Sequence, residues 1–561
     1  MAIRKIALTS ALLLIGAPTA LAMSPAHAAP LDGVRTPVSP SYAVTLTSNS
    51  TGGTWTGHES VSFTNASTDP LTEVYLRLWD NFHGSCPSTP VTVSNVTGGS
   101  AGALTVNCTA LKVTLPGPLV RNATASIGFD LRIVVPAGID RFGHDGSFYF
   151  VGNALPVLAV RDTRGWHLDP YTNNGESFYS LISDYDVRLD HPSGLSVPAT
   201  GTSVDTPGSS GRTVTRATAT KVREFAWGAG PFRKISATSG AGVRVNVYSV
   251  SGISTSSAQS MLNLSTSALD AHARRFGAYP YGEADVVLDN GFWFGGMEYP
   301  GFVLDRVSST ALAHELAHQW WYGIVGDDEY NDPWLDEGFT DYATDLYFNQ
   351  TRAGCGITWQ SSAERLTNSM AYWDAHSSRY GTVVYGYGKC TLHDLRRLLG
   401  DTAMANLMSS YAQSHWYGIS TVADFKAAAQ VAAGSTDWVC QRGPPEGPVV
   451  YEGQSGWNIR SQVLLALSAS ASSATSRHAS ADRWRASAAS SRWASARRSH
   501  RARARSPPWA CACASSISAR APSRKDSTSE RARAASASCR ASSIRPSSKA
   551  ICASRKSSCA W

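Results

Sequence analysis

The chain has 561 residues, 43% of them hydrophobic, and a formal net charge of +7. That length leaves room for two to four domains with their own cores, and the average composition is that of a globular protein. The positive charge is local: residues 461–561 hold 19 Lys and Arg against three acidic residues, so the rest of the chain is net acidic. Without a recognisable binding fold or regularly interleaved aromatic residues, the charge gives no reason to expect a nucleic-acid partner.

The first 28 residues have the pattern of a secretory signal peptide. Basic residues precede an apolar run, Ile6–Leu21, and Ala26–Ala28 fits a small-x-small cleavage site. The alternative is a membrane anchor, but Gly16 and Pro18 interrupt the run, which is shorter than the roughly 20 residues of a span. We therefore expect cleavage after Ala28, secretion of the mature chain and no membrane insertion.

Residues 29–238 are predicted to form a largely antiparallel β domain. Apolar and polar side chains alternate in Tyr42–Thr47, Val74–Leu78 and Tyr185–Leu189, and turn-forming sequences separate the runs. Nothing in this region requires a catalytic role, so we expect a scaffold or docking domain.

Residues 239–438 are predicted to form a second domain that is mostly helical. Two short apolar runs, Val286–Leu288 and Phe302–Leu304, are typical of strands, and helical patterns dominate from Ser308 to about Ala433. The fold class is thus multidomain, β plus α/β: an antiparallel β domain comes first, and a helical domain with a small sheet follows.

Residues 439–561 form a low-complexity basic tail rich in Ser, Ala and Arg. Its aliphatic residues are too few and too irregular to build a core, so we expect disorder. Three interpretations stay open: a polycationic tail that binds acidic surfaces, a plain flexible extension, and translation out of frame. The abrupt change in composition near Trp438 favours the third.

The cysteines before that tail suit local disulfides. In an exported protein we expect Cys86 to pair with Cys108, and Cys355 with Cys390, because each pair closes a local loop. Buried thiols are the alternative.

The segment Ala311–Gly323, ALAHELAHQWWYG, carries two histidines four residues apart. Ser308 is a suitable N-cap and the glycine that ends the segment is a suitable stop, which predicts one helix between them. His314 and His318 then share a face and can bind one metal ion, and Glu315 can reach a water on that ion. Imidazole nitrogens suit Zn²⁺; the alternative is a pair of core histidines satisfied by hydrogen bonds.

A catalytic zinc needs a third protein ligand, and the next predicted helix offers one. That helix opens at Asp332–Pro333 and carries Glu337, separated from His318 by 18 residues. An antiparallel return of this helix would complete a His₂Glu set with the fourth position open for water. Asp336 and Asp341 are alternative ligands by spacing, but they lie on other faces of the helix.

Together these motifs resemble those of the gluzincin aminopeptidases, the aminopeptidase N and leukotriene hydrolase family. The zinc motif and WLDEGF around Glu337 match the family in spacing. GGMEY, Gly295–Tyr299, is similar to its Gly-Ala-Met-Glu-Asn segment, and YGKC, Tyr387–Cys390, to its Tyr-x-Lys-Gly. The likeness covers roughly residues 40–438 in domain order and implies a thermolysin-like catalytic domain. Gly296, Tyr299 and Cys390 depart from the family's residues.

The resemblance implies a role for each residue of the zinc site. One Zn²⁺ per chain, held by the two histidines and Glu337, polarises the scissile carbonyl and acidifies a water. Glu315 takes the proton of that water as general base and passes it to the leaving amine. A tyrosine hydroxyl stabilises the oxyanion. We expect Tyr387 in this role, because it alone fits Tyr-x-Lys, and Tyr385 is the competitor.

The resemblance also implies an aminopeptidase. Glu298 binds the α-ammonium of a peptide with a free N-terminus, and Gly295, Gly296 and Met297 lie along the substrate, with the two glycines pairing to its backbone. A turn residue between strands is the alternative role for Glu298. A zinc endopeptidase, which needs no Glu298, and a non-catalytic peptide-binding relative are the alternative functions.

Overall fold

The computed structural model describes residues 34–86, 88–350 and 356–434. The expected signal peptide, the expected basic tail and Cys355 of the second expected disulfide lie outside these residues. The first expected disulfide is confirmed: Cys86 and Cys108 are bonded, with their Cα atoms 5.2 Å apart. The described residues belong to one unit, in which a β half and a helical half contact each other.

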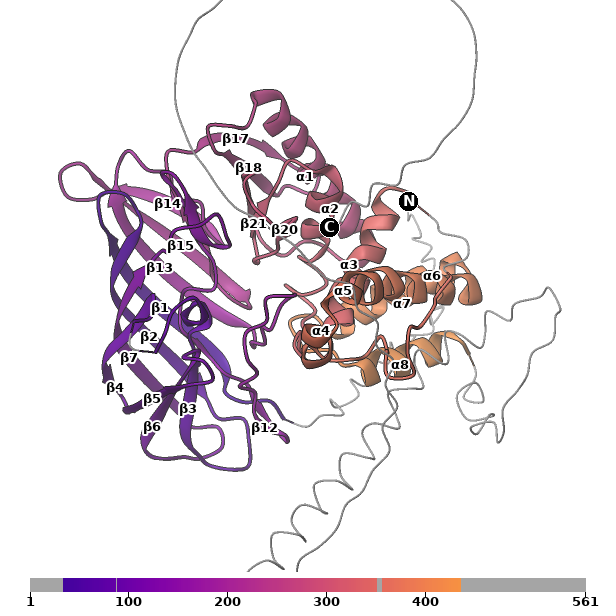
Figure 1. The fold of residues 1–561 in the computed structure, drawn as a ribbon, viewed down its shortest axis with the longest axis horizontal. Coiled ribbons are helices and arrows are strands. Elements are labelled where there is room, and N and C mark those ends of the chain that lie inside the picture. Colours follow the sequence, from indigo (N-terminus) through magenta and orange to yellow (C-terminus); the bar gives the residue numbers. More distant parts are fainter. Residues whose placement is uncertain (1–33, 87, 351–355, 435–561) are drawn as a thin grey trace, which may run out of the picture. The chain divides into compact units, whose positions relative to one another are not determined.

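The β half is built around a seven-stranded sheet, drawn in indigo and purple in Figure 1. In β1 the side chains of Tyr42, Val44 and Leu46 are buried and those between them are exposed, as the alternating pattern predicts. β1 and β13 are parallel and every other neighbouring pair in this sheet is antiparallel. The strand order is β14 (Thr202–Pro207), β15 (Arg212–Val222), β13 (Ser183–Pro192), β1 (Val38–Ser48), β2 (Thr54–Thr64), β7 (Thr124–Val134) and β4 (Val91–Thr97).

Smaller sheets complete the β half. A four-stranded sheet has the order β10 (Val157–Leu158), β3 (Leu71–Arg77), β6 (Ala110–Leu119) and β5 (Ser100–Thr105). A three-stranded sheet has the order β16 (Trp227–Ala229), β9 (Phe148–Val151) and β8 (Phe142–Asp145), and β11 (Arg161–Asp162) pairs with β12 (Gly165–Trp166). A 3₁₀ turn, η1, spans Trp79–His83.

The helical half begins one strand earlier than the sequence indicates. β17 (Arg233–Thr238) pairs with β18 (Arg244–Ser249), so it belongs to the second half, before the expected boundary at residue 239. Alternation marks a strand but does not tell which sheet it joins. The sheet continues with β19 (Glu283–Leu288), β21 (Phe302–Asp305) and β20 (Gly296–Met297), with β18, β19 and β21 parallel.

Helices cover this sheet and extend beyond it (Figure 1). They are α1 (Thr255–Phe276), α2 (Ser309–Ala317), α3 (Pro333–Tyr347), α4 (Met370–Ala375), α5 (Ser377–Tyr380), the π-helical turn η2 (Gly381–Tyr387), α6 (Gly388–Leu399), α7 (Asp401–Ser414) and α8 (Val422–Ala432). Over the described ranges, no helix is long and apolar enough to cross a membrane.

One buried arginine connects the two halves. Arg223 follows β15 and is 2% exposed. Its guanidinium donates to the carbonyl of Ser180 in the β half and to those of Tyr322, Ile324 and Gly418 in the helical half, over 2.6–3.2 Å. A buried guanidinium needs such partners, because its donors would otherwise lose their hydrogen bonds to water.

Candidate metal centre

Helix α2 carries His314 of the metal motif, and His318 is the residue that follows its last turn. It begins as expected, because the Ser308 side chain accepts a hydrogen bond from the Ala311 amide. It ends at Ala317 rather than at the expected glycine, Gly323. The backbone leaves the helical pattern there: the Trp320 amide donates to the Ala317 carbonyl three residues back, the Gly323 amide donates to the His318 carbonyl, and Tyr322 has a φ of 145°. The Gln319 amide group donates to the carbonyls of Glu298 and Tyr299 and accepts from the Gly301 amide. That contact ties the chain after His318 to the GGMEY segment.

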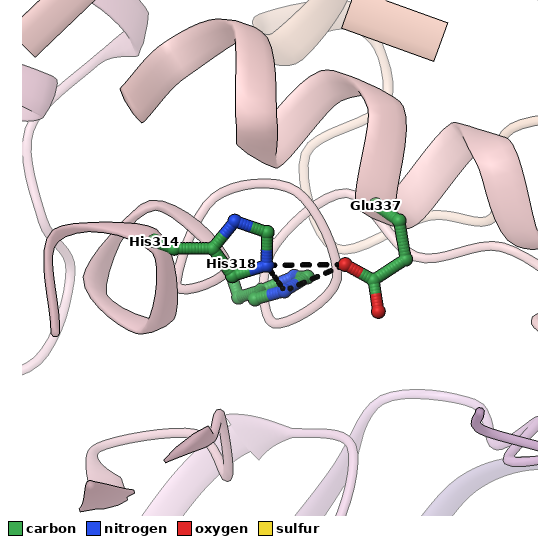
Figure 2. Close-up of side chains that lie close together, drawn as sticks. All are labelled: His314, His318 and Glu337. Carbon is green, nitrogen blue, oxygen red and sulfur yellow. Dashed lines mark hydrogen bonds and ion pairs between the residues drawn. The ribbon is translucent and has the colours of Figure 1, made fainter. Parts of the chain in front are cut away.

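His314, His318 and Glu337 point toward one another, the histidines from the α2 motif and the glutamate from α3 (Figure 2). The Nε2 atoms of the histidines are 3.0 Å apart, and the Glu337 Oε2 lies 3.1 Å from that of His314 and 3.4 Å from that of His318. The sequence-predicted third ligand therefore lies beside the first two.

These three atoms fit a tetrahedral zinc ion. Bonds of about 2.0–2.2 Å place tetrahedral ligand atoms roughly 3.3–3.6 Å apart, within a few tenths of an ångström of the observed separations. Burial raises the pKa of Glu337, but hydrogen bonds with His314 and His318 outweigh it and hold that pKa at about 2. The carboxylate is thus ionised, as a metal ligand must be.

The two alternative ligands, Asp336 and Asp341, lie behind the histidines instead. Asp341 Oδ1 is 3.0 Å from Nδ1 of His314, as expected of a hydrogen-bonded support. Nδ1 of His318 lies 3.0 Å from the Thr340 hydroxyl of α3 and 3.1 Å from the Trp321 carbonyl, and Asp336 Oδ1 is a charged neighbour at 2.6 Å. A carboxylate that accepts the Nδ1 proton fixes the ring and leaves Nε2 with its lone pair toward a metal. Helix α3 therefore supplies one ligand and the supports of both others.

Glu315 lies beside the cluster as the sequence predicts. It is 5% exposed, and its Oε2 has no hydrogen-bond partner among the described residues. Burial raises its pKa to about 8, while the neighbouring His314 opposes that shift. Its carboxyl group lies against Gly296, where a Cβ atom would come within 2.5 Å of Glu315 Cδ. Glycine at this position therefore leaves room for the carboxyl group.

Glu298 reaches the same place from β20 and the loop after it. It is 3% exposed, and its Oε1 has no partner in the described part of the chain. Carboxylate oxygens of Glu298 and Asp336 and a ring nitrogen of His318 lie within 4.8 Å of one another. A buried carboxylate oxygen without a donor is costly, which makes this position suited to a cationic group of a ligand.

Gly295, Gly296 and Met297 form the edge of the sheet in the helical half. β20 pairs only with β21 in the described sheet, through Gly296 with Asp305 and Met297 with Leu304. The backbone on the other side of this strand is where an extended peptide could add. Met297 is buried, and its sulfur accepts a hydrogen bond from Arg141 Nη1 at 3.2 Å.

The expectation that Tyr387 faces the metal centre does not hold in the structure. The Tyr387 hydroxyl bonds to the amide and carbonyl of Thr358, on the exposed side of its turn. The Tyr385 hydroxyl instead donates to Glu337, and its ring stacks on that of His314 at 5.8 Å. Burial and the Glu337 charge raise the pKa of Tyr385 well above its ordinary value, so it stays a proton donor.

One site residue has no counterpart in the sequence motifs. Glu176 lies in the β half, between β12 and β13, and its Oε1 accepts from Arg141 Nη1 at 3.0 Å. Burial raises its pKa to about 7, Arg141 lowers it, and the charges of Glu298 and Glu337 raise it further. No local pattern marks Glu176, because its link to the site runs through Arg141, 35 residues earlier, whose Nη1 also contacts the Met297 sulfur.

Comparison with known proteins agrees with this geometry. Residues 260–441 match the Peptidase family M1 domain. Endoplasmic reticulum aminopeptidase 2 of Bos taurus is 33% identical over 218 residues, which cover 33% of this chain and 23% of that protein. Aminopeptidase N of Streptomyces lividans is 24% identical over 192 residues, or 28% of this chain and 22% of that protein. The match thus spans under a quarter of either relative.

The fold also matches a solved structure. The M1 zinc metallopeptidase from Deinococcus radiodurans superposes with a TM-score of 0.54 at 18% sequence identity, over 72% of this chain and 91% of that one. The expected order of a β domain followed by a helical domain is therefore confirmed.

Proposed function

We propose that the chain is a zinc aminopeptidase of the gluzincin aminopeptidase N family, acting on peptides with a free N-terminus. One observation carries the choice of aminopeptidase. Glu298 is buried, and its Oε1 has no hydrogen-bond partner among the described residues. A carboxylate oxygen of Glu298 lies within 4.8 Å of a ring nitrogen of His318, so an α-ammonium bound to Glu298 is held next to the metal ligands. A charge-assisted bond at that position restricts cleavage to the first peptide bond.

Each residue of the site then has a defined role in the reaction. When bound, Zn²⁺ polarises the scissile carbonyl and acidifies a water. Glu315 takes a proton from the attacking water and gives it to the leaving amine, since it is buried beside the ligands and its Oε2 has no hydrogen-bond partner among the described residues. The Tyr385 hydroxyl donates to the oxyanion that develops on the carbonyl oxygen. We assign this role to Tyr385 and not to Tyr387.

The edge of β20 supports binding of an extended peptide. Gly295 and Gly296 expose backbone groups there, and Gln319 fixes the carbonyl of Glu298 by a 3.1 Å hydrogen bond. Main-chain pairing of this kind tolerates many side chains. The preferred first residue is therefore decided by other groups.

Hydrolysis of two matched amino-acid anilides tests the proposal. One has a free α-amine and the other is acetylated, and each is assayed with and without a zinc chelator. Cleavage of only the free-amine substrate, lost on chelation and restored by Zn²⁺, is the expected result. Cleavage of both would identify an endopeptidase, and a folded, zinc-loaded protein that cleaves neither would indicate a peptide-binding protein.

We also propose that the chain is exported and loses residues 1–28. The Cys86–Cys108 disulfide supports this, because such bonds persist in oxidising compartments. N-terminal sequencing of the protein recovered outside the producing cells should read from Ala29. A first residue within the first 28, in protein from inside the cells only, would contradict the proposal.

A further inference from the structure

Helices α3 and α6 meet along a row of alternating acidic and basic side chains. Asp341 and Asp345 are four apart on α3, and Lys389 and His393 are four apart on α6, so each pair shares one face of its helix. Lys389 Nζ lies 2.9 Å from Asp341 Oδ2 and 3.8 Å from Asp345 Oδ1. His393 Nε2 lies 3.1 Å from Asp345 Oδ2. The row therefore runs acid, base, acid, base from one helix to the other.

Two glycines allow the helices to come this close. A Cβ atom at Gly388 would lie 2.8 Å from the Cα of Gly338, and one at Gly338 would lie 3.0 Å from the Cα of Gly388. Because the neighbouring atoms are backbone, a larger side chain would separate the helices. Gly338 follows the metal ligand Glu337 in sequence, and Gly388 precedes Lys389. The short distance between the two helices at these glycines therefore allows the Lys389 ammonium to reach α3.

The row ends on a metal ligand. Asp341 uses one carboxylate oxygen for His314 Nδ1, at 3.0 Å, and the other for Lys389, at 2.9 Å. A carboxylate held at both oxygens cannot turn without losing one contact. Held this way, it keeps the proton on Nδ1 of His314 and the Nε2 lone pair aimed at the ion.

Lys389 has no other evident task at the site. Its side chain is 18% exposed and lies between two aspartates, so its charge is already compensated within the protein. A compensated, largely buried ammonium is a weak anchor for a substrate carboxylate.

We propose that Lys389 is a positioning residue for zinc: through Asp341 it fixes the His314 ring and so slows the release of the ion. This inference rests on the proposed zinc site but not on the peptide substrate. Removing the ammonium leaves the Asp341 carboxylate held at one oxygen only, and the ring it supports becomes free to tilt. The loss is expected in metal retention first.

The experiment measures zinc release from the full-length protein into a chromophoric chelator, together with the absorption spectrum of the Co²⁺-substituted protein. The variants are Lys389→Met, Lys389→Arg and Asp341→Asn, with Lys112→Met as matched control. Lys112 pairs with Glu73 within the β half, so its variant removes a lysine–carboxylate pair far along the chain from the metal motif. Circular dichroism and thermal unfolding establish that each variant is folded.

We expect Lys389→Met to release zinc about 10-fold faster and to alter the Co²⁺ spectrum, because loss of an outer partner of a ligating histidine costs about 10–100-fold in metal affinity. Lys389→Arg should restore retention, Asp341→Asn should weaken it at least as much as Lys389→Met, and Lys112→Met should match wild type. Wild-type release from Lys389→Met, or equal release from Lys389→Arg and Lys389→Met, would overturn the inference. Wild-type protein that holds zinc but cleaves no peptide would overturn only the proposed function, and wild-type protein without zinc would overturn both.

Discussion

Replacing Tyr385 by Phe removes one hydroxyl group and leaves the packing of the ring. The ring lies against His314 at 5.8 Å and against Tyr380 at 5.6 Å, and phenylalanine can make both contacts. What is lost is the donor that now bonds to Glu337 and that would turn to the oxyanion when substrate is bound. We therefore expect the variant to fold and to keep zinc.

The expected loss is in turnover. Removing one oxyanion donor costs about 2.7–4 kcal/mol, which corresponds to roughly 10²–10³-fold in kcat. KM should change little, because the bond is made mainly in the transition state. The assay is steady-state hydrolysis of the free-amine anilide, with zinc content measured on the same sample so that metal loss is not counted as lost catalysis.

Tyr387→Phe is the matched control, two residues along the same turn. Its hydroxyl bonds to Thr358 on the exposed side of the turn, beside Arg379, and not to the metal centre, so we expect a change within about 0.5 kcal/mol, or roughly twofold. A large loss of kcat in Tyr387→Phe with normal kcat in Tyr385→Phe would refute the assignment made from the structure.

Three further predictions concern other parts of the molecule. Glu298→Gln should lower kcat/KM for the free-amine anilide by a factor that corresponds to about 2–5 kcal/mol, the usual cost of removing one side of a buried charge pair. Equal kcat/KM in the variant and the wild type would rule out the α-ammonium contact. Gly388→Ala should lower the free energy of unfolding by about 1–3 kcal/mol, because its methyl group meets the Gly338 backbone, and unchanged denaturant unfolding would show that α6 can shift at no cost. Replacing Cys86 and Cys108 by Ser removes a cross-link between residues 22 apart and should lower that free energy by about 3 kcal/mol in the same assay, whereas no change would mean that the unfolded chain is not restricted by the bond.

The proximity of the candidate metal ligands was predictable, because helical spacing brings two of them together. Residues four apart share a face, and the structure places His314 and His318 with their Nε2 atoms 3.0 Å apart. The position of Glu337 depends on a second helix that returns antiparallel to the first. The spacing of 18 residues from His318 is compatible with such a return but does not determine it. The end of α2 was not predictable, because the chain leaves the helix through a turn in which Tyr322, not a glycine, has a positive φ of 145°.

The tyrosine shows how a motif can mislead. The pattern Tyr-x-Lys selects Tyr387, two residues before Lys389, and places the two on different sides of any helix. Tyr385 and Lys389 are four apart and both face α3, where their partners are Glu337 and Asp341. Helical periodicity favours Tyr385, because residues four apart lie on the same face. No periodicity helps with Glu176, which reaches the site from the other half of the chain.

Arg223 has a consequence for how the molecule melts. Its guanidinium is bonded to carbonyl groups of Ser180 on one side and of Tyr322, Ile324 and Gly418 on the other. If the helical half unravelled first, the buried Arg223 cation of the β half would lose three acceptors, and if the β half unravelled first, three carbonyl groups of the helical half would lose a donor. The halves should therefore melt together, as a single calorimetric transition whose van't Hoff enthalpy equals the measured heat.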